Sequence, residues 1–550
     1  MRLFYILFAA LLALPCNAVA SERLTIGISQ FPSTLHPSFD SMAAKSYVTA
    51  MARRPLTTHD TNWEITCLLC TSLPKLDDGT ATYTTNADGS DGIAVTYTLD
   101  ANAVWGDGTP ITTEDVQFTW EVGREPTTGI DNFELYQRIE KIDLHDAHNF
   151  TLHMNKRTCD YQAIHDFNIL PAHIEREYFS DPREYKKRTA YDRDTTNPGL
   201  WYGPYRVANI QSGRSILLVR NERWWGKKPY FDEILIRAIE NTASLTANLL
   251  SGDIDMIAGE LGLTIDQALA FQTREKESYK FIFKPGLIYE HIDMNLDNPI
   301  LADKRVRQAL IQSINREAIS QQLFAGKQPT AHGQTHPLDS VYYKDTPKYE
   351  YNPKAATALL DSAGWALGAK GIRHNAAGDP LRLELMTTAG NKSRELVEQV
   401  LQSQWKQMGI DIRIRNEPAR VFFGETVNKR KFTGLAMYAW LSTPLNVPRT
   451  TLHSSMIPVE KTNWSGQNFT GFNNAEMDQV IDDLEVKCDP QENQELWNRL
   501  QTIYAAELPV IPLYFRANSY ILPKNLIGLE PTGHQYPSSL WVENWKIQPE

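Results

Sequence analysis

The chain has 550 residues, a formal net charge of −11 and 42% hydrophobic residues. This length exceeds the size at which a single hydrophobic core stops growing, so we expect two or three lobes. The acidic charge is spread along the chain rather than concentrated in a tail, which disfavours nucleic acid and anionic membrane surfaces as partners.

The N-terminus has the pattern of an export signal. Arg2 supplies a basic start, residues 3–14 are apolar, and Ala18–Ala20 is a small-residue cleavage site that leaves Ser21 as the mature start. The apolar run is too short to stay in a bilayer as a helix. A lipid anchor on Cys16 is the alternative, although the proline directly before it fits such a site poorly. The sequence therefore predicts a soluble, exported protein.

The four cysteines that remain after the signal indicate disulfides. An even number of cysteines in an oxidising compartment favours pairing. Cys67 and Cys70 are close enough to close a small loop, and Cys159 and Cys488 are then a candidate second pair. Turn residues follow Cys70, which argues against a redox catalyst, and one close pair alone argues against a zinc site. The sequence leaves the pairing open.

The first third of the chain mixes strands with one helix. Residues 24–28 alternate as a strand, and further strand patterns stand at 95–99 and 150–154. Residues 115–122 have the spacing of a helix. Residues 181–197 are highly charged and contain a proline, with another directly after them, which predicts a surface connection.

The next stretch, residues 202–257, contains the most informative pattern. A Gly-Pro turn begins one strand, two apolar strands follow, and then a helix ended by Gly252 and a short strand. We place the first strand after residue 204 and the two apolar strands at 216–219 and 234–237. The helix is expected at 243–250 and the short strand at 255–257. A strand, a helix and a returning strand are typical of a right-handed crossover onto a parallel sheet.

The second half predicts a further α/β unit. Asp303 caps a helix that we expect to run to Ala325, because apolar residues form one stripe along it. Two alternating strands flank an amphipathic helix, which predicts a second parallel sheet with its own core. We place these strands at 381–385 and 410–414, the intervening helix at 396–408, later helices at 475–486 and 490–506, and a last strand at 510–515.

Several short motifs occur in a fixed order along the chain. They are Val104–Val116 with its Trp-Gly-Asp-Gly turn, Tyr202–Arg206, Asn221–Gly226, Gly252–Asp255, Asp303–Leu310 and Leu508–Tyr514. Each is moderately specific, and their order is strongly specific. The chain thereby resembles the family 5 extracellular solute-binding proteins of bacterial ABC importers, the peptide-, nickel- and opine-binding group, over nearly the whole mature length.

The resemblance implies an α/β fold of the periplasmic binding protein type, a two-lobed type II clamshell with an additional inserted α+β subdomain. It also implies a division of the chain. Residues 1–20 are the signal peptide, 21–59 the first part of lobe I, 60–197 an inserted subdomain of lobe I, 198–285 the second part of lobe I, 286–506 lobe II, and 507–550 the return to lobe I.

The function implied is that of a periplasmic receptor. It captures a peptide or peptide-like small solute between hinged lobes and delivers it to the permease subunits of an ABC importer, as a monomer without cofactor or metal. The sequence contains no nucleophile-elbow, zinc-protease, P-loop or dinucleotide-binding motif, so we expect no catalysis. An exported hydrolase, or a ligand-sensing signalling partner on the same scaffold, is the alternative.

The resemblance also selects ligand-binding candidates. Trp440 matches an aromatic position of the family's peptide binders, with a core position as its alternative, and Thr443 stands where those proteins have an aspartate that pairs with the peptide's α-ammonium. A buried ammonium without a carboxylate partner is unfavourable by several kcal/mol. We therefore expect either a different acid, with Glu260 as the candidate, or a ligand without a free amino terminus. A solvated loop carboxylate is the alternative for Glu260.

Three further residues complete the predicted site. Tyr514 stands at a family pocket position. Arg449 suits a ligand carboxylate, because a guanidinium binds carboxylate through two parallel hydrogen bonds, and a surface salt bridge is its alternative. Tyr289 precedes the first helix of the second lobe, where the sequence favours a hinge or core position over a ligand contact.

Overall fold

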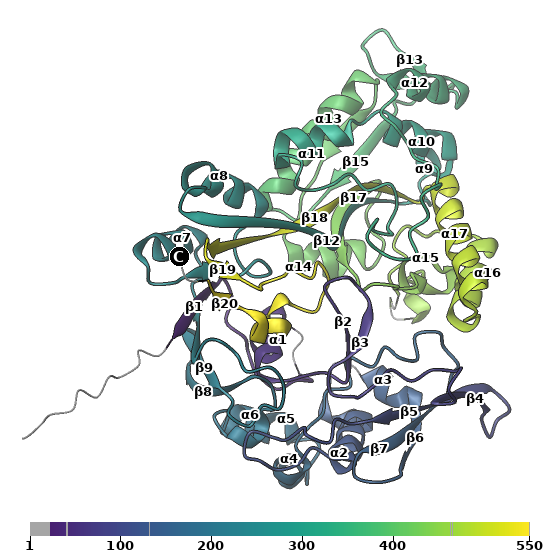
Figure 1. Ribbon diagram of the computed structural model, residues 1–550. Coiled ribbons are helices and arrows are strands. Elements are labelled where there is room, and N and C mark those ends of the chain that lie inside the picture. The colour runs from purple at the N-terminus through teal and green to yellow at the C-terminus, as the bar shows by residue number, and fades with distance from the viewer. Residues whose placement is uncertain (1–21, 40–41, 131–132, 463, 465, 549–550) are drawn as a thin grey trace, which may run out of the picture.

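The computed structural model describes residues 22–39, 42–130, 133–462, 464 and 466–548. The expected signal peptide lies outside these residues. Figure 1 shows two lobes, with lobe II drawn above lobe I and two long strands running between them. These strands are β12 (Tyr279–Met294) and β18 (Val510–Pro523), which pair antiparallel.

A single sheet of ten strands runs through both lobes in the order β16-β15-β17-β12-β18-β11-β1-β10-β9-β8. The second sheet predicted for lobe II is therefore not separate. The reason is the length of the two central strands: 16 residues in β12 and 14 in β18. At about 3.3 Å per residue they span roughly 50 Å, enough to pair with strands of both lobes.

The lobe I half of this sheet confirms the predicted crossover. Strand β1 (Arg23–Ile28) pairs in parallel with β10 (Glu233–Ala238) and with β11 (Met256–Ile257). Helix α7 (Thr242–Ser251) connects β10 to β11, capped by Asn241 and ended by Gly252 at φ 79°. Strands β9 (Ser215–Arg220) and β8 (Tyr205–Gln211) complete this edge.

The region between β1 and β8 adds a second sheet and several helices. The sheet has the order β4 (Ala81–Thr85), β5 (Asp91–Thr98), β7 (Asn149–Met154) and β6 (Ile139–Leu144). The helices are α1 (Ala43–Ala52), α2 (Thr113–Arg124), α3 (Phe133–Arg138) and α4 (Ala172–Tyr178). Their apolar side chains belong to the same buried cluster as those of β1 and β10, so this region and the lobe I sheet share one core.

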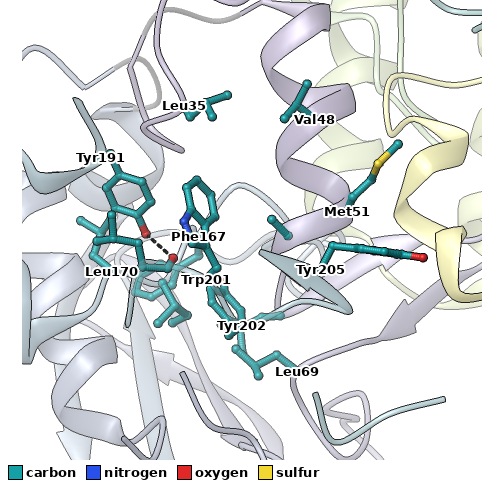
Figure 2. Close-up of a cluster of buried hydrophobic side chains, with 14 of the residues drawn as sticks. Leu35, Val48, Met51, Leu69, Phe167, Leu170, Tyr191, Trp201, Tyr202 and Tyr205 are labelled. Carbon is teal, nitrogen blue, oxygen red and sulfur yellow. Dashed lines mark hydrogen bonds between the residues drawn. The ribbon is translucent and has the colours of Figure 1, made fainter. Parts of the chain in front are cut away.

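The segment predicted to be a surface connection, residues 181–197, is partly core. It forms the short helices α5 (Tyr185–Arg188) and α6 (Ala190–Arg193), and the side chains of Tyr185 and Tyr191 are fully buried. The Tyr191 hydroxyl donates to the Leu200 carbonyl at 3.2 Å (Figure 2). The charged residues of the segment face out, while its aromatic residues fill lobe I.

Lobe II has its own core around β17 (Leu435–Leu441), β15 (Arg382–Met386) and β16 (Asp411–Ile414). Helix α13 (Lys392–Gln407) connects the parallel pair β15–β16, as predicted. The single helix expected over residues 303–325 is two, α10 (Lys304–Gln312) and α11 (Arg316–Phe324), because the Asn315 side chain accepts the Ala318 N–H and begins a new helix.

Helix α8 (Ile265–Glu275) precedes β12. The other helices and strands of lobe II and of the C-terminal return are α9 (Pro299–Ala302), α12 (Pro353–Ser362), β13 (Ala366–Leu367), β14 (Arg373–His374), α14 (Ala419–Val421), α15 (Arg449–Leu452), α16 (Ala475–Val486), α17 (Pro490–Glu507), β19 (Leu526–Ile527) and β20 (Lys546–Ile547). In the described part of the chain, no helix combines the length and apolar character that crossing a bilayer requires.

Two disulfides form, as predicted from the four cysteines, and the structure gives their pairing as Cys67 with Cys70 and Cys159 with Cys488. The second connects the region of the four-stranded sheet to the segment between α16 and α17 of lobe II. The Cys159 N–H also donates to the Glu485 carbonyl at 2.9 Å. The two lobes are therefore joined covalently at one end of the gap between them, in addition to the two long strands.

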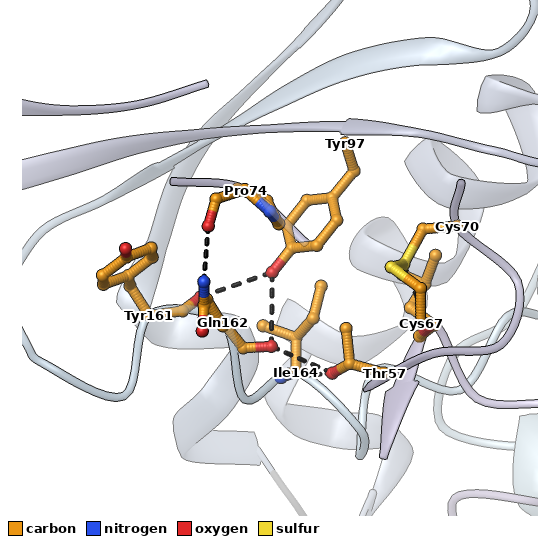
Figure 3. The surroundings of a disulfide bond; sticks show 9 residues. Thr57, Cys67, Cys70, Pro74, Tyr97, Tyr161, Gln162 and Ile164 are labelled. Carbon is orange, nitrogen blue, oxygen red and sulfur yellow. Dashed lines mark hydrogen bonds between the residues drawn. A yellow bond between two sulfur atoms is a disulfide. The ribbon is translucent and has the colours of Figure 1, made fainter. Parts of the chain in front are cut away.

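The first disulfide lies at the base of a hairpin made of β2 (Thr57–His59) and β3 (Ile65–Cys67). Figure 3 shows how this hairpin is attached to the neighbouring loop. The Thr57 hydroxyl donates to the Gln162 carbonyl at 2.9 Å, and the Gln162 side-chain amide donates to the Pro74 carbonyl at 2.6 Å. These bonds hold the loop that contains Gln162 and His165 against lobe I.

Candidate functional site

Three adjoining cavities lie at the junction of the lobes. Cavity A lies within lobe II, cavity B between the Cys159 region and lobe II, and cavity C against lobe I. Including space open to solvent, they enclose about 910, 1500 and 1310 Å³. Thr443 lines both A and B, Leu441 lines both A and C, and His165 lines both B and C. The cavities therefore form one interlobe cleft around the segment 441–446.

The aromatic wall of cavity A comes from two neighbouring strands. Tyr289 of β12 lies directly opposite Trp440 of β17 in the antiparallel register, so both side chains stand on the same face of the sheet. The Tyr289 hydroxyl is 2.9 Å from that of Tyr504, and its ring stacks on His291 with centroids 5.0 Å apart. The Trp440 ring packs against Phe469 and is only partly buried, which leaves a face toward the cavity.

Cavity A is acidic. Asp293 and Asp339 line it, and none of the described residues in its wall is a lysine or arginine. The Asp339 carboxylate accepts the Leu445 N–H at 3.0 Å, and burial raises the pKa of this carboxyl. Asp293 accepts the Tyr438 hydroxyl and lies 3.4 Å from the His291 Nε2. This chemistry suits a cationic or hydrogen-bond-donating group beside aromatic rings.

Cavity B contains several charged side chains that already have partners. Arg449 lines it, but its guanidinium is held by Glu485 at 2.5 Å and by Asp482. Lys156 pairs with the same Glu485 at 2.8 Å. The alternative considered for Arg449, a salt bridge, is therefore what the structure contains, although the residue does lie in the cleft.

A buried ion cluster lies behind the cleft in the middle of the central strands. Glu290 of β12 is fully buried and pairs with Arg394 at 2.5 Å and Arg516 at 2.8 Å. Burial alone would raise the pKa of Glu290, but the two guanidinium groups outweigh it and hold the pKa below its usual range. This cluster fixes α13 to both central strands, because removing one partner would leave a buried charge uncompensated.

The predicted site residues fall into two groups. Trp440, Tyr289 and Thr443 line cavity A, and Thr443 and Arg449 line cavity B. Tyr514 and Glu260 line none of the three cavities.

Tyr514 is a core residue of lobe II, against the sequence prediction. It is 3% exposed and packs against Phe324, with ring centroids 5.1 Å apart. In the register of β18 with β12, Tyr514 lies opposite Glu290, whereas its neighbour Phe515 lies opposite Tyr289. Because side chains alternate between the faces of a strand, Phe515 shares the face of Tyr289 and Tyr514 points to the other face.

Glu260 belongs to lobe I. Its carboxylate accepts the Ser538 N–H at 2.8 Å and lies near the buried hydroxyls of Tyr47 and Tyr520. It is therefore neither at the cleft nor the solvated loop residue considered as its alternative.

Among the cleft residues that sequence reasoning missed, four have titratable side chains that the site uses: Asp339, Asp293, Arg53 and His165. The only signal for Asp339 in the sequence is that it is an acid shortly after His336. Its hydrogen bond to the Leu445 N–H, two residues beyond Thr443, becomes visible only in the structure. The others come from separate elements that only the fold brings together.

An α/β protein whose lobes share two long strands and enclose a cleft has the architecture of a solute receptor. Comparison with known sequences gives the same class. Residues 81–455 match the sequence model of the family described as bacterial extracellular solute-binding proteins, family 5, middle region. The match covers more than half of the chain, so the chain belongs to this family.

Relatives cover nearly the full length. The chain is 26% identical over 512 residues to the oligopeptide-binding protein AppA of Bacillus subtilis, covering 92% of this chain and 88% of that one. It is similar to the crystal structure of the oligopeptide-binding protein of Thermus thermophilus complexed with a pentapeptide, with 29% identity, a TM-score of 0.69 and coverage of 94% and 95%.

The fold alone is shared with more distant structures. The ABC transporter substrate-binding protein CtaP of Listeria monocytogenes superposes with a TM-score of 0.79 at 17% identity, covering 96% of this chain and 99% of that one.

Proposed function

We propose that this protein is a periplasmic receptor that captures a peptide or peptide-like solute in the interlobe cleft and presents it to the permease of an ABC importer. The observation that carries this proposal is the cleft itself, in which three joined cavities draw their walls from both lobes. The relatives named for oligopeptide binding, and the pentapeptide complex, support a peptide as the ligand.

The capture step follows from two lobes that can move but not separate. A ligand that contacts both lobes at once stabilises the closed arrangement relative to the open one. We place the hinge where the pairing of β12 with β18 shifts register, between Pro285 and Tyr289. Gly286 lies there, and a Cβ on it would come within 2.1 Å of the Gly533 carbonyl oxygen, so the backbones of the two segments touch.

We propose Asp339 as the acid that meets a cationic group of the ligand, in place of Glu260. Its carboxylate lies in the wall of cavity A beside the Trp440 loop, and its bond to Leu445 N places it next to Thr443. A receptor of micromolar affinity needs about −8 kcal/mol of net binding free energy. One carboxylate–ammonium pair and aromatic walls from Trp440, Trp497 and Tyr289 suffice for that order of magnitude.

Export and delivery complete the proposal. The pattern of residues 1–20 predicts a cleaved signal, and the two disulfides fit an oxidising compartment. The permease as partner rests on membership of the family. We propose that the solute is bound and released unchanged.

The test is binding of defined peptides. A pool of short peptides with free amino termini, and the same pool N-acetylated, is titrated against the purified protein, with affinity and melting temperature as readouts. We expect the free peptides to bind and Asp339→Asn to weaken them about ten-fold, with little change for acetylated ones. Glu260→Gln is the matched control and should bind as wild type. Equal binding by wild type and Asp339→Asn would remove Asp339 from the proposal.

A further inference from the structure

Two neighbouring arginines at the end of α1 have opposite environments. Arg54 has a counter-ion and carbonyl partners: it forms an ion pair with Glu543 at 2.6 Å and donates to the carbonyls of Ala50 and Arg53 at 2.8 and 2.9 Å. Arg54 therefore satisfies the C-terminal carbonyls of α1 and has a structural role. Arg53 is also buried, but its partners are neutral, and its guanidinium carbon lies 5.7 Å from the centroid of the Tyr202 ring.

Arg53 is 6% exposed and lines cavity C. Its Nη2 donates to the Asn168 Oδ1 at 3.2 Å and to the Tyr202 hydroxyl at 3.3 Å, both neutral groups. Tyr202 is anchored in the lobe I core (Figure 2), which fixes this side of the guanidinium. Among the described residues no carboxylate lies within ion-pair distance of Arg53, and its Nε is buried without a hydrogen-bond partner.

A buried guanidinium that has neutral hydrogen-bond partners but no counter-ion is unfavourable by several kcal/mol. Such a group persists where a ligand supplies the missing charge, and a carboxylate matches the Nε–Nη fork of arginine. The structural role that would otherwise explain a cation at this helix end is already filled by Arg54.

The rest of the wall of cavity C agrees with an anion. Lys45 lines it and is 5% exposed, with its ammonium donating to the Pro37 carbonyl at 3.2 Å and to that of Phe39. His165 lines it with an Nδ1 that is buried and has no hydrogen-bond partner. Asp166 is the acid in this wall, so the wall contains two cationic side chains, Lys45 and Arg53, and one carboxylate.

We propose that cavity C is a carboxylate-binding subsite in which Arg53, assisted by His165, holds an anionic group of the ligand. This inference deepens the proposed function and rests on it for the nature of the ligand. Cavity A, which is acidic, and cavity C, which is basic, meet at Leu441. A ligand with a cationic group in A and a carboxylate in C would contact lobe II with one end and lobe I with the other, which is the arrangement that favours closure.

The experiment compares the same peptides as free acids and as C-terminal amides, on wild type, Arg53→Gln and Arg53→Lys. Arg413→Gln is the control, because Arg413 is exposed on the edge strand β16 and its loss changes net charge equally. Millimolar glutarate alone is a second probe, with melting temperature as the readout, so that the subsite is tested even without a bound peptide.

We expect wild type and Arg413→Gln to prefer the free acids by at least about ten-fold, Arg53→Gln to lose this preference while still binding the amides, and Arg53→Lys to keep part of it. Glutarate should stabilise wild type but not Arg53→Gln. If neither peptide form binds, but glutarate raises the melting temperature of wild type and not that of Arg53→Gln, the carboxylate subsite is supported and the proposal of peptide capture is wrong. Equal affinity of wild type for acids and amides, or a preference that survives in Arg53→Gln, overturns the subsite, as does glutarate having no effect on wild type.

Discussion

Trp63 of lobe I packs against His336 of lobe II, with ring centroids 5.0 Å apart. Trp63 lies at the tip of the β2–β3 hairpin, where its indole N–H donates to the Thr532 carbonyl at 2.6 Å. His336 in turn packs against Phe515 of β18, and its Nε2 is buried without a hydrogen-bond partner. This contact joins the lobes beside cavity A and depends on a neutral imidazole.

Ligand affinity should therefore fall as the pH is lowered. Burial, with a smaller contribution from Lys284, lowers the pKa of His336 to about 4. In an open form the exposed imidazole returns toward its ordinary pKa of about 6.5. Between these values the open form binds more protons than the closed form, so acid favours opening. We expect a loss of roughly ten-fold in affinity from about pH 7 to pH 5.

Titration calorimetry across this range checks the pH dependence. His336→Gln should flatten the profile, whereas His148→Gln, which lines none of the three cavities, should leave it as in wild type. A profile that stays steep in His336→Gln would assign the effect to other groups, such as the buried His59, His165 and His534.

The disulfide between Cys159 and Cys488 should limit how far the lobes open. It joins them across the cleft with a sequence separation of 329. Replacing both cysteines by serine should enlarge the ligand-free protein, speed ligand release several-fold and lower the free energy of unfolding by about 2–5 kcal/mol. The radius of gyration from small-angle X-ray scattering measures the opening.

The local disulfide supplies the control for this prediction. Replacing Cys67 and Cys70, which are three residues apart within lobe I, should change stability but not the radius of gyration. If the Cys159–Cys488 variant has the same ligand-free dimensions as wild type, the bond does not restrain opening.

Trp440→Ala should weaken ligand binding by about 1–3 kcal/mol, because it removes an aromatic wall of cavity A. Trp224→Ala is the matched control: that ring packs against Trp225 and lines none of the three cavities. Fluorescence or calorimetric titration compares the two. Equal affinity in both variants would place Trp440 outside the binding surface.

Glu398→Gln should stabilise the protein at neutral and alkaline pH. Glu398 of α13 is 1% exposed, its Oε1 has no hydrogen-bond partner, and burial raises its pKa to about 7. Because the unfolded chain loses this proton first, stability declines as the pH rises from about 4.5 through 7. Glutamine keeps the acceptor for Asn416 without the charge, so we expect a gain of about 1–2 kcal/mol at pH 8 that vanishes below pH 5. Denaturant unfolding at both pH values measures it.

The sequence predicted the elements of each lobe, because periodicity and caps are local signals. The α7 crossover onto β1 and the parallel pair around α13 are examples. It did not predict that both lobes share one sheet. That depends on pairing between β12 and β18, which lie more than 200 residues apart and follow no local pattern.

The site was predicted only in part, for physical reasons that differ by residue. Trp440 and Thr443 were selected through the family resemblance and do line cavity A. Tyr514 was selected in the same way but lies in the core, because neighbouring residues of a strand face opposite sides and it is Phe515 that shares the face of Tyr289. Arg53 was missed because its proposed role depends on the absence of a counter-ion among the described residues, which the sequence does not reveal. An arginine without a counter-ion can be recognised only once its neighbours are known.

The central claim is that the lobes close on a dissolved solute and release it unchanged. Native mass spectrometry of protein purified without refolding, followed by incubation with short peptides and recovery of the bound fraction, tests it directly. We predict one peptide per chain, recovered intact. A protein that retains no peptide from the pool, or returns it cleaved, would contradict this account.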